Sequence, residues 1–117
     1  MNVASVVLAV LLAVFFLPLG TAKILALPQT RQLAVESGFS VTAYRAIGVL
    51  EAAAAVGLLL GLAIPLLGGL AGTGLLLLMT GALVTHLRQG DGPRKFAPAV
   101  IVALLVTAYL ATHLATA

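Results

Sequence analysis

The sequence has no cysteine, no tryptophan and few charged residues. Without thiols, the chain forms no disulfide, carries out no thiol–disulfide exchange and holds no thiolate-bound metal or iron–sulfur cluster. Four-helix membrane enzymes that work through paired thiols are therefore excluded. Charged residues make up 8% of the chain, compared with about a quarter in a typical soluble domain. A nucleic-acid-binding domain is also excluded, because the six Lys and Arg residues form no clustered basic face.

Hydrophobic residues dominate the chain. They make up 62% of its 117 residues, and the mean hydropathy is +1.24. A helix needs about 20 apolar residues to cross a hydrocarbon core of roughly 30 Å. The length therefore accommodates four spans with short connections, all within a single domain comprising residues 1–117. The sequence predicts an all-α fold, an integral membrane four-helix bundle.

The predicted spans cover residues 3–27, 42–63, 66–87 and 97–116. We expect the first span to be kinked at Pro18 and to be retained, because no basic residue precedes it as in a signal peptide. Residues 28–38 mix apolar and charged side chains and end in a glycine, which predicts a short interfacial helix. Pro65 turns the second span into the third, and Pro98 is expected in the first turn of the fourth.

The basic residues predict the orientation in the membrane. With four spans, the connection between spans 1 and 2 and the one between spans 3 and 4 lie on the same side. All six basic residues flank these two connections, and basic residues are retained in the cytoplasm. We therefore expect both termini outside the cytoplasm. The residues concerned are Lys23, Arg31, Arg45, Arg88, Arg94 and Lys95.

Glu51 is the carboxylate expected inside a span. It lies about 13 Å along the second span, at 1.5 Å per residue, where an unpaired charge is costly. Lys23, Tyr44 and Thr80 are its candidate partners. Glu51 either holds the bundle together through such a bond or binds a ligand or a proton, and the sequence leaves both interpretations open.

A second group of polar residues is expected at the cytoplasmic ends of the spans. Thr85 and His86 close the third span on the same side as Lys23 and Tyr44. A histidine at a helix end is commonly an interfacial anchor or a favourable charge, and acid–base chemistry is the alternative. We predict a polar cleft that narrows from this surface toward Glu51. No metal site and no catalytic motif is predicted.

Three groups of residues resemble a known family. They are Lys23-Ile24, then Gly48-Val-Leu-Glu51 with Gly57-Leu-Leu-Leu-Gly61, and finally Met79-Thr-Gly-Ala-Leu-Val-Thr-His86-Leu-Arg88-Gln-Gly-Asp91. Over about the first 90 residues the chain is similar to the DoxX-like family of small bacterial four-helix membrane proteins. The resemblance implies a multi-pass protein of the bacterial inner membrane, associated with quinone-linked redox systems. It places the family's polar positions at Lys23, Glu51 and His86.

Taken together, we expect a small membrane subunit that binds a quinone or a lipid, as an accessory component of a membrane redox complex. Any redox role is expected to need a partner, because no catalytic motif is present. The expected partners are the lipid bilayer and other redox-complex subunits or further copies of the chain, with no nucleic acid. A proton-coupled small-molecule transporter and a purely structural subunit are the alternatives. The predicted pocket comprises Lys23, Tyr44, Glu51, Thr85 and His86.

Overall fold

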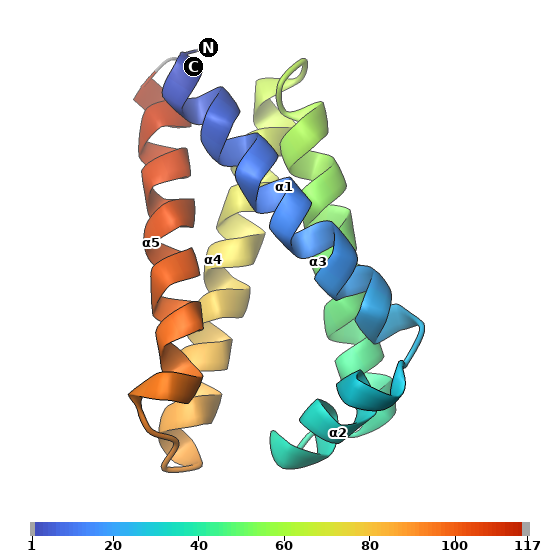
Figure 1. Cartoon of the computed structure of the whole chain (residues 1–117). Coiled ribbons are helices and arrows are strands. Elements are labelled where there is room, and N and C mark those ends of the chain that lie inside the picture. The colour runs from blue at the N-terminus through green and yellow to red at the C-terminus, as the bar shows by residue number, and fades with distance from the viewer. Residues whose placement is uncertain (1, 116–117) are drawn as a thin grey trace.

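The computed structural model describes residues 2–115, and all its regular elements are helices. The all-α prediction is confirmed. Four of the helices are long and apolar enough to cross a membrane, and the fifth, α2, is short. The elements, shown in Figure 1, are α1 (Val3–Ile24), α2 (Pro28–Glu36), α3 (Val41–Leu60), α4 (Pro65–Arg88) and α5 (Pro93–Ala115).

Three helix boundaries differ from the predicted ones by three or four residues, and one of them is the end of α3, at Leu60 rather than at residue 63. The first helix ends at Ile24 rather than at residue 27, because the chain turns at Ala26, which has a positive φ of 52°. The last helix begins at Pro93 rather than at residue 97, so Pro98 lies inside it. Pro93 fits the first helical position because its missing N–H would have had no partner there. The predicted end at residue 116 lies outside the described residues.

The four long helices form a closed ring in the order α1, α3, α4, α5 (Figure 1). The most extensive packing joins α1 to α3, and α4 packs against both α3 and α5. The ring closes where the start of α1 meets the end of α5, and there Asn2 Nδ2 donates a hydrogen bond to the Thr112 carbonyl at 3.3 Å. The N-terminal end of α1 and the C-terminal end of α5 therefore lie at the same end of the bundle.

Glycines bring the helices into close contact around the ring, and two of these contacts join α1 to α3 and α3 to α4. A Cβ added at Gly20 of α1 would lie 2.7 Å from the Gly48 carbonyl oxygen of α3. A Cβ added at Gly61, at the end of α3, would lie 2.5 Å from Gly68 Cα of α4. Small residues allow such approach between helices in lipid, where packing replaces the hydrophobic effect.

The outer surface of the bundle is apolar. Large side chains such as Val14, Leu77 and Leu104 are each more than half exposed. Exposed threonines satisfy their hydroxyls inside their own helix, as Thr73 does by donating to the Gly69 carbonyl at 2.8 Å. A surface of this kind is suited to hydrocarbon, where every polar group needs an internal partner.

Candidate functional site

Lys23 and Glu51 form an ion pair between α1 and α3. The Glu51 side chain is 3% exposed and the Lys23 side chain 15%, so the pair is largely buried inside the bundle. Gly48, one turn before Glu51, allows α1 to come this close, because a Cβ there would lie 2.6 Å from Lys23 Cβ. The Lys23 ammonium also lies 5.0 Å from the centre of the Tyr44 ring, within cation–π range.

A cavity of about 780 Å³ opens between α3 and α4 beside this ion pair. Its walls are mainly apolar, with residues such as Ile47, Leu50 and Leu78. The cleft is therefore less polar than the sequence led us to expect. All five residues of the predicted pocket line it, namely Lys23, Tyr44, Glu51, Thr85 and His86.

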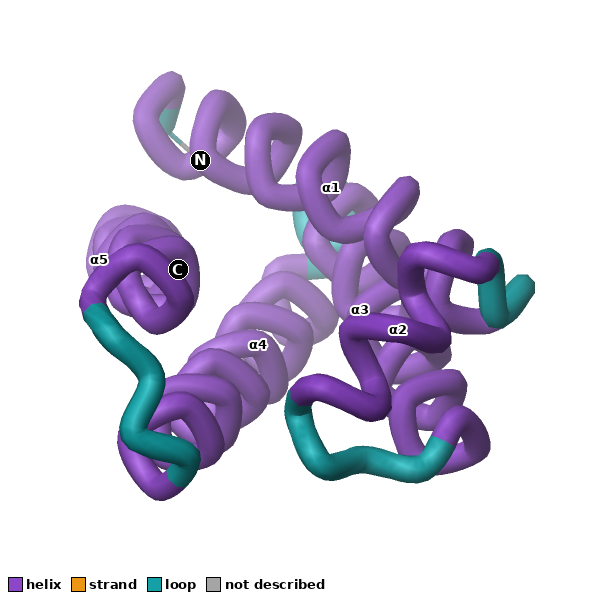
Figure 2. Tube along the Cα trace, turned by 60° about the horizontal axis from the view of Figure 1, so that its bottom comes forward, coloured by secondary structure: helices purple, strands orange, loops and turns teal. Residues whose placement is uncertain are grey.

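The packing of α3 against α4 explains where the cavity lies. The two helices are close near their connecting turn, where a Cβ at Gly57 would lie 2.9 Å from Ala71 Cβ. Toward the other end they diverge, and in Figure 2 the near end of α4 lies apart from α2 and α3. On the α4 side, Gly74 and Gly81 line the cavity, and a Cβ added to either would meet nothing within 4 Å. The wall of α4 is thus hollowed where the helices separate.

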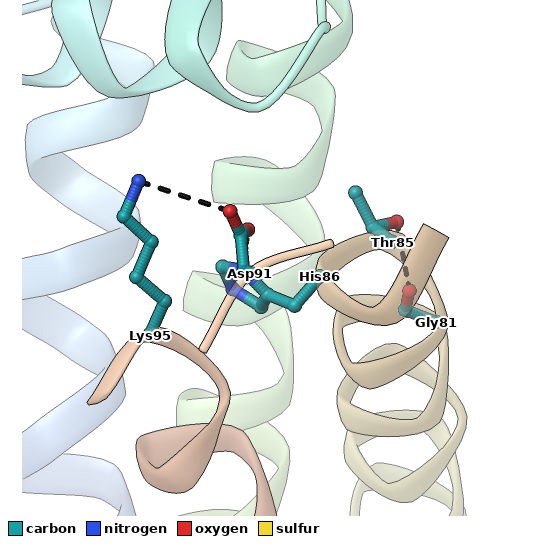
Figure 3. A network of polar contacts seen from close by, with 5 residues as sticks. All are labelled: Gly81, Thr85, His86, Asp91 and Lys95. Atoms are coloured by element: carbon teal, nitrogen blue, oxygen red, sulfur yellow. Dashed lines mark hydrogen bonds and ion pairs between the residues drawn. The ribbon is translucent and has the colours of Figure 1, made fainter. Parts of the chain in front are cut away.

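His86, at the mouth of the cavity, belongs to a charged network that the sequence did not predict (Figure 3). Its Nδ1 lies 2.7 Å from Asp91 Oδ2, and the Lys95 ammonium lies 3.8 Å from Asp91 Oδ1. The loop holds Asp91 in place, because its backbone N–H donates to the His86 carbonyl at 3.0 Å. Gly90 makes this turn possible with a φ of 72°.

Other polar candidates lie elsewhere. The Thr80 hydroxyl donates to the Leu76 carbonyl of its own helix at 2.8 Å and does not reach Glu51. His113 Nε2 lies 2.7 Å from the Pro65 carbonyl oxygen, at the far end of α4 from His86. Residues 2–115 contain no group of three His, Cys, Asp or Glu side chains placed to hold a metal ion.

Four apolar helices, an apolar surface and one buried ion pair define a multi-pass integral membrane protein. The profile of the DoxX-like family matches residues 7–108. The chain therefore belongs to the DoxX-like family, and the match extends into α5, beyond the resemblance found in the sequence. Comparison with curated proteins and with solved structures gave no significant match.

Proposed function

We propose that this protein is a membrane subunit that binds a quinone-like or lipid-like molecule in the cavity between α3 and α4. The observation that carries the proposal is the combination of an apolar cavity of about 780 Å³ with a few polar groups on its wall. Pockets for small molecules are typically of about 300–1,000 Å³ and have this composition. An apolar ring or chain would occupy the volume, and the polar groups would orient its head.

The polar side chains fit a ligand with oxygen atoms at its head. The Lys23 ammonium has three donor hydrogens, of which Glu51 takes one, so it can also donate to a ligand oxygen. His86 brings a ring nitrogen to the cavity, and the Tyr44 hydroxyl can donate or accept. A quinone, if bound, would supply the electron-transfer chemistry. The chain's own residues would bind it, orient it and exclude water.

We further propose that both termini face away from the cytoplasm of a bacterial inner membrane. The six basic residues support this, because they all flank the connections at the cavity's open end. Leu33 and Val35 of α2 are 50% and 72% exposed beside charged neighbours, as in a helix that lies at the membrane interface. The cavity then opens near the cytoplasmic surface, where a redox partner or another copy of the chain could dock.

A cavity-filling substitution tests the proposal. Gly74→Leu places an apolar side chain in the cavity, whereas Gly69→Leu places the same side chain on the same helix outside it. A Cβ at either position meets nothing within 4 Å, so neither change should disturb folding. The binding of decylubiquinone to protein in lipid nanodiscs would be measured by equilibrium titration. We expect Gly74→Leu to weaken binding by about tenfold or more and Gly69→Leu to leave it unchanged.

Equal binding by the wild type and Gly74→Leu would contradict a ligand site in this cavity. Mass spectrometry of lipids and quinones that copurify with the wild type would identify the natural ligand. A purely structural subunit is the second candidate, favoured by the Lys23–Glu51 pair that joins α1 to α3. In that case, neither variant would alter binding, because no quinone would bind specifically.

A further inference from the structure

Asp91 contacts Nδ1 of His86, which is one of the two ring nitrogens that can carry the proton of a neutral imidazole. Its carboxylate oxygen lies 2.7 Å from His86 Nδ1. An ionised carboxylate can only accept hydrogen bonds, so Nδ1 must be the donor in this contact. A neutral imidazole carries one N–H, and a hydrogen bond at one nitrogen fixes the state of the other. With Nδ1 protonated, Nε2 is left as an acceptor.

The second nitrogen is the one available to a ligand. His86 lines the cavity, and its Nε2 makes no hydrogen bond to any residue that the structure describes. Thr85, its neighbour at the cavity mouth, uses its hydroxyl to donate to the Gly81 carbonyl at 2.9 Å. With Nδ1 bound to Asp91, Nε2 is the nitrogen left for His86 to offer to the cavity as an acceptor, whereas Lys23 offers donors from the neighbouring wall.

We propose that Asp91 is a positioning residue that holds His86 in the Nδ1–H tautomer, and that the cavity mouth thereby prefers a ligand with a hydroxyl donor. The chemical class is an apolar molecule with a phenolic or hydroquinone hydroxyl. The second part deepens the proposed function and rests on it. The first part concerns His86 and Asp91 alone and can be tested without any ligand.

The charges around His86 decide between this tautomer and a doubly protonated ring. The C-terminal end of α4 favours a positive charge on His86. Lys95 opposes a positive charge on His86, because the Lys95 ammonium lies 3.8 Å from the Asp91 carboxylate and already balances the negative charge of Asp91. Arg88 and Arg94, two and eight residues after His86 in the chain, add two more positive charges to the same segment. A neutral ring with Nδ1–H satisfies Asp91 without placing a fourth positive charge there.

Nitrogen NMR of the imidazole rings tests the tautomer. The chain has two histidines, so ¹⁵N-histidine labelling gives two pairs of ring-nitrogen signals, and His86→Gln identifies the pair from His86. We expect the wild type in nanodiscs to show the Nδ1–H form for His86. Asp91→Asn should yield a mixture of tautomers, because an amide can both accept and donate. Asp91→Glu, which keeps the carboxylate, should restore the Nδ1–H form.

The matched control is Glu36→Gln, which makes the same change from carboxylate to amide at the end of α2, at a residue that does not itself line the cavity. It should leave the His86 signal unchanged. A wild-type ring in the Nε2–H form, or one doubly protonated at neutral pH, would overturn the assignment of Asp91. An unchanged tautomer in Asp91→Asn would overturn it as well.

Ligand preference is tested with decylhydroquinone and its dimethyl ether, titrated under argon into protein in phosphatidylcholine nanodiscs. One hydrogen bond to Nε2 should make the hydroquinone bind about three- to tenfold tighter than the ether. Asp91→Asn should reduce this ratio, and Glu36→Gln should keep it. Equal ratios in wild type and Asp91→Asn would overturn the donor preference. If neither probe binds, the proposed function and the preference both fail, whereas the role of Asp91 is still decided by the NMR spectra.

Discussion

Removing Lys23 should destabilise the protein more than removing its partner. In Lys23→Met the long apolar stem is kept and the charge is lost, so Glu51 remains inside the bundle with a side chain that is 3% exposed. In Glu51→Met the remaining Lys23 sits in the last turn of α1, with a side chain 15% exposed. Lys23 can extend its ammonium toward the interface, whereas Glu51, in the middle of α3, cannot escape.

The expected magnitudes follow from this asymmetry. Breaking a buried ion pair so that one charge stays buried costs about 3–5 kcal/mol, which we expect for Lys23→Met. Glu51→Met should cost only about 1 kcal/mol, because Lys23 regains solvation at the membrane surface. The double variant should resemble Glu51→Met, because replacing both charges by apolar groups removes the uncompensated one. The two single changes should therefore be strongly non-additive.

Thermal unfolding in detergent, followed by far-UV circular dichroism, measures these differences without relying on thiol dyes or tryptophan fluorescence. We expect the midpoint of Lys23→Met to fall by about 10 °C or more, and most of that loss to be recovered in the double variant. Equal losses in both single variants, or losses that add in the double variant, would refute the reasoning. The ion pair would then have no special role in joining α1 to α3.

Three further predictions concern packing, function and topology. Gly48→Ala should destabilise the protein by about 1–3 kcal/mol in the same unfolding assay, because its Cβ would lie 2.7 Å from a backbone oxygen, whereas Gly69→Ala, which meets nothing within 4 Å, should not. Glu51→Gln should weaken decylubiquinone binding and change the unfolding midpoint little, because Gln keeps the shape and the hydrogen bonds of Glu but loses its charge. Equal loss of folded protein in Glu51→Gln and Glu51→Ala, without a separate loss of binding, would favour a structural role. A reporter fused to the C-terminus should be active outside the cytoplasm and one in residues 90–93 inside, and the reverse pattern would contradict the orientation.

Hydrophobicity and length carried most of the information about the fold. The four long apolar stretches indicated four membrane-spanning helices because apolar side chains are more stable in hydrocarbon or in the bundle core than in water, and each stretch is long enough to span the membrane. The start of the last helix was harder to predict, because either of two prolines could occupy its first turn. Pro93 takes that position and Pro98 lies inside α5, which depends on how the loop at Gly90 turns.

The candidate site was partly accessible from the sequence. The cost of a carboxylate in a span marked Glu51, and the ends of the predicted helices placed Lys23 and His86 at the same end of the bundle. Asp91 was missed because a carboxylate in a glycine-rich turn is expected to be exposed, whereas in the structure its side chain is 15% exposed. Its contact with His86 depends on a backbone hydrogen bond back to the end of α4, and residue spacing alone does not determine that bond. Its sequence signals were its position shortly after a helix-ending histidine and its place at the end of the segment from Met79 to Asp91 that resembles the family.

The position of the ion pair in the ring links the two interpretations of Glu51. Lys23 and Glu51 join α1 to α3, while α4 is held against α5, where Tyr109 packs onto Gly68. The cavity lies between these two helix pairs, so a ligand could separate α3 from α4 without breaking the ion pair. The same carboxylate can then stabilise one pair of helices and form part of the wall of the cavity. A structural role for Glu51 therefore does not argue against a binding role, and only the comparison of binding with unfolding in one variant separates their contributions.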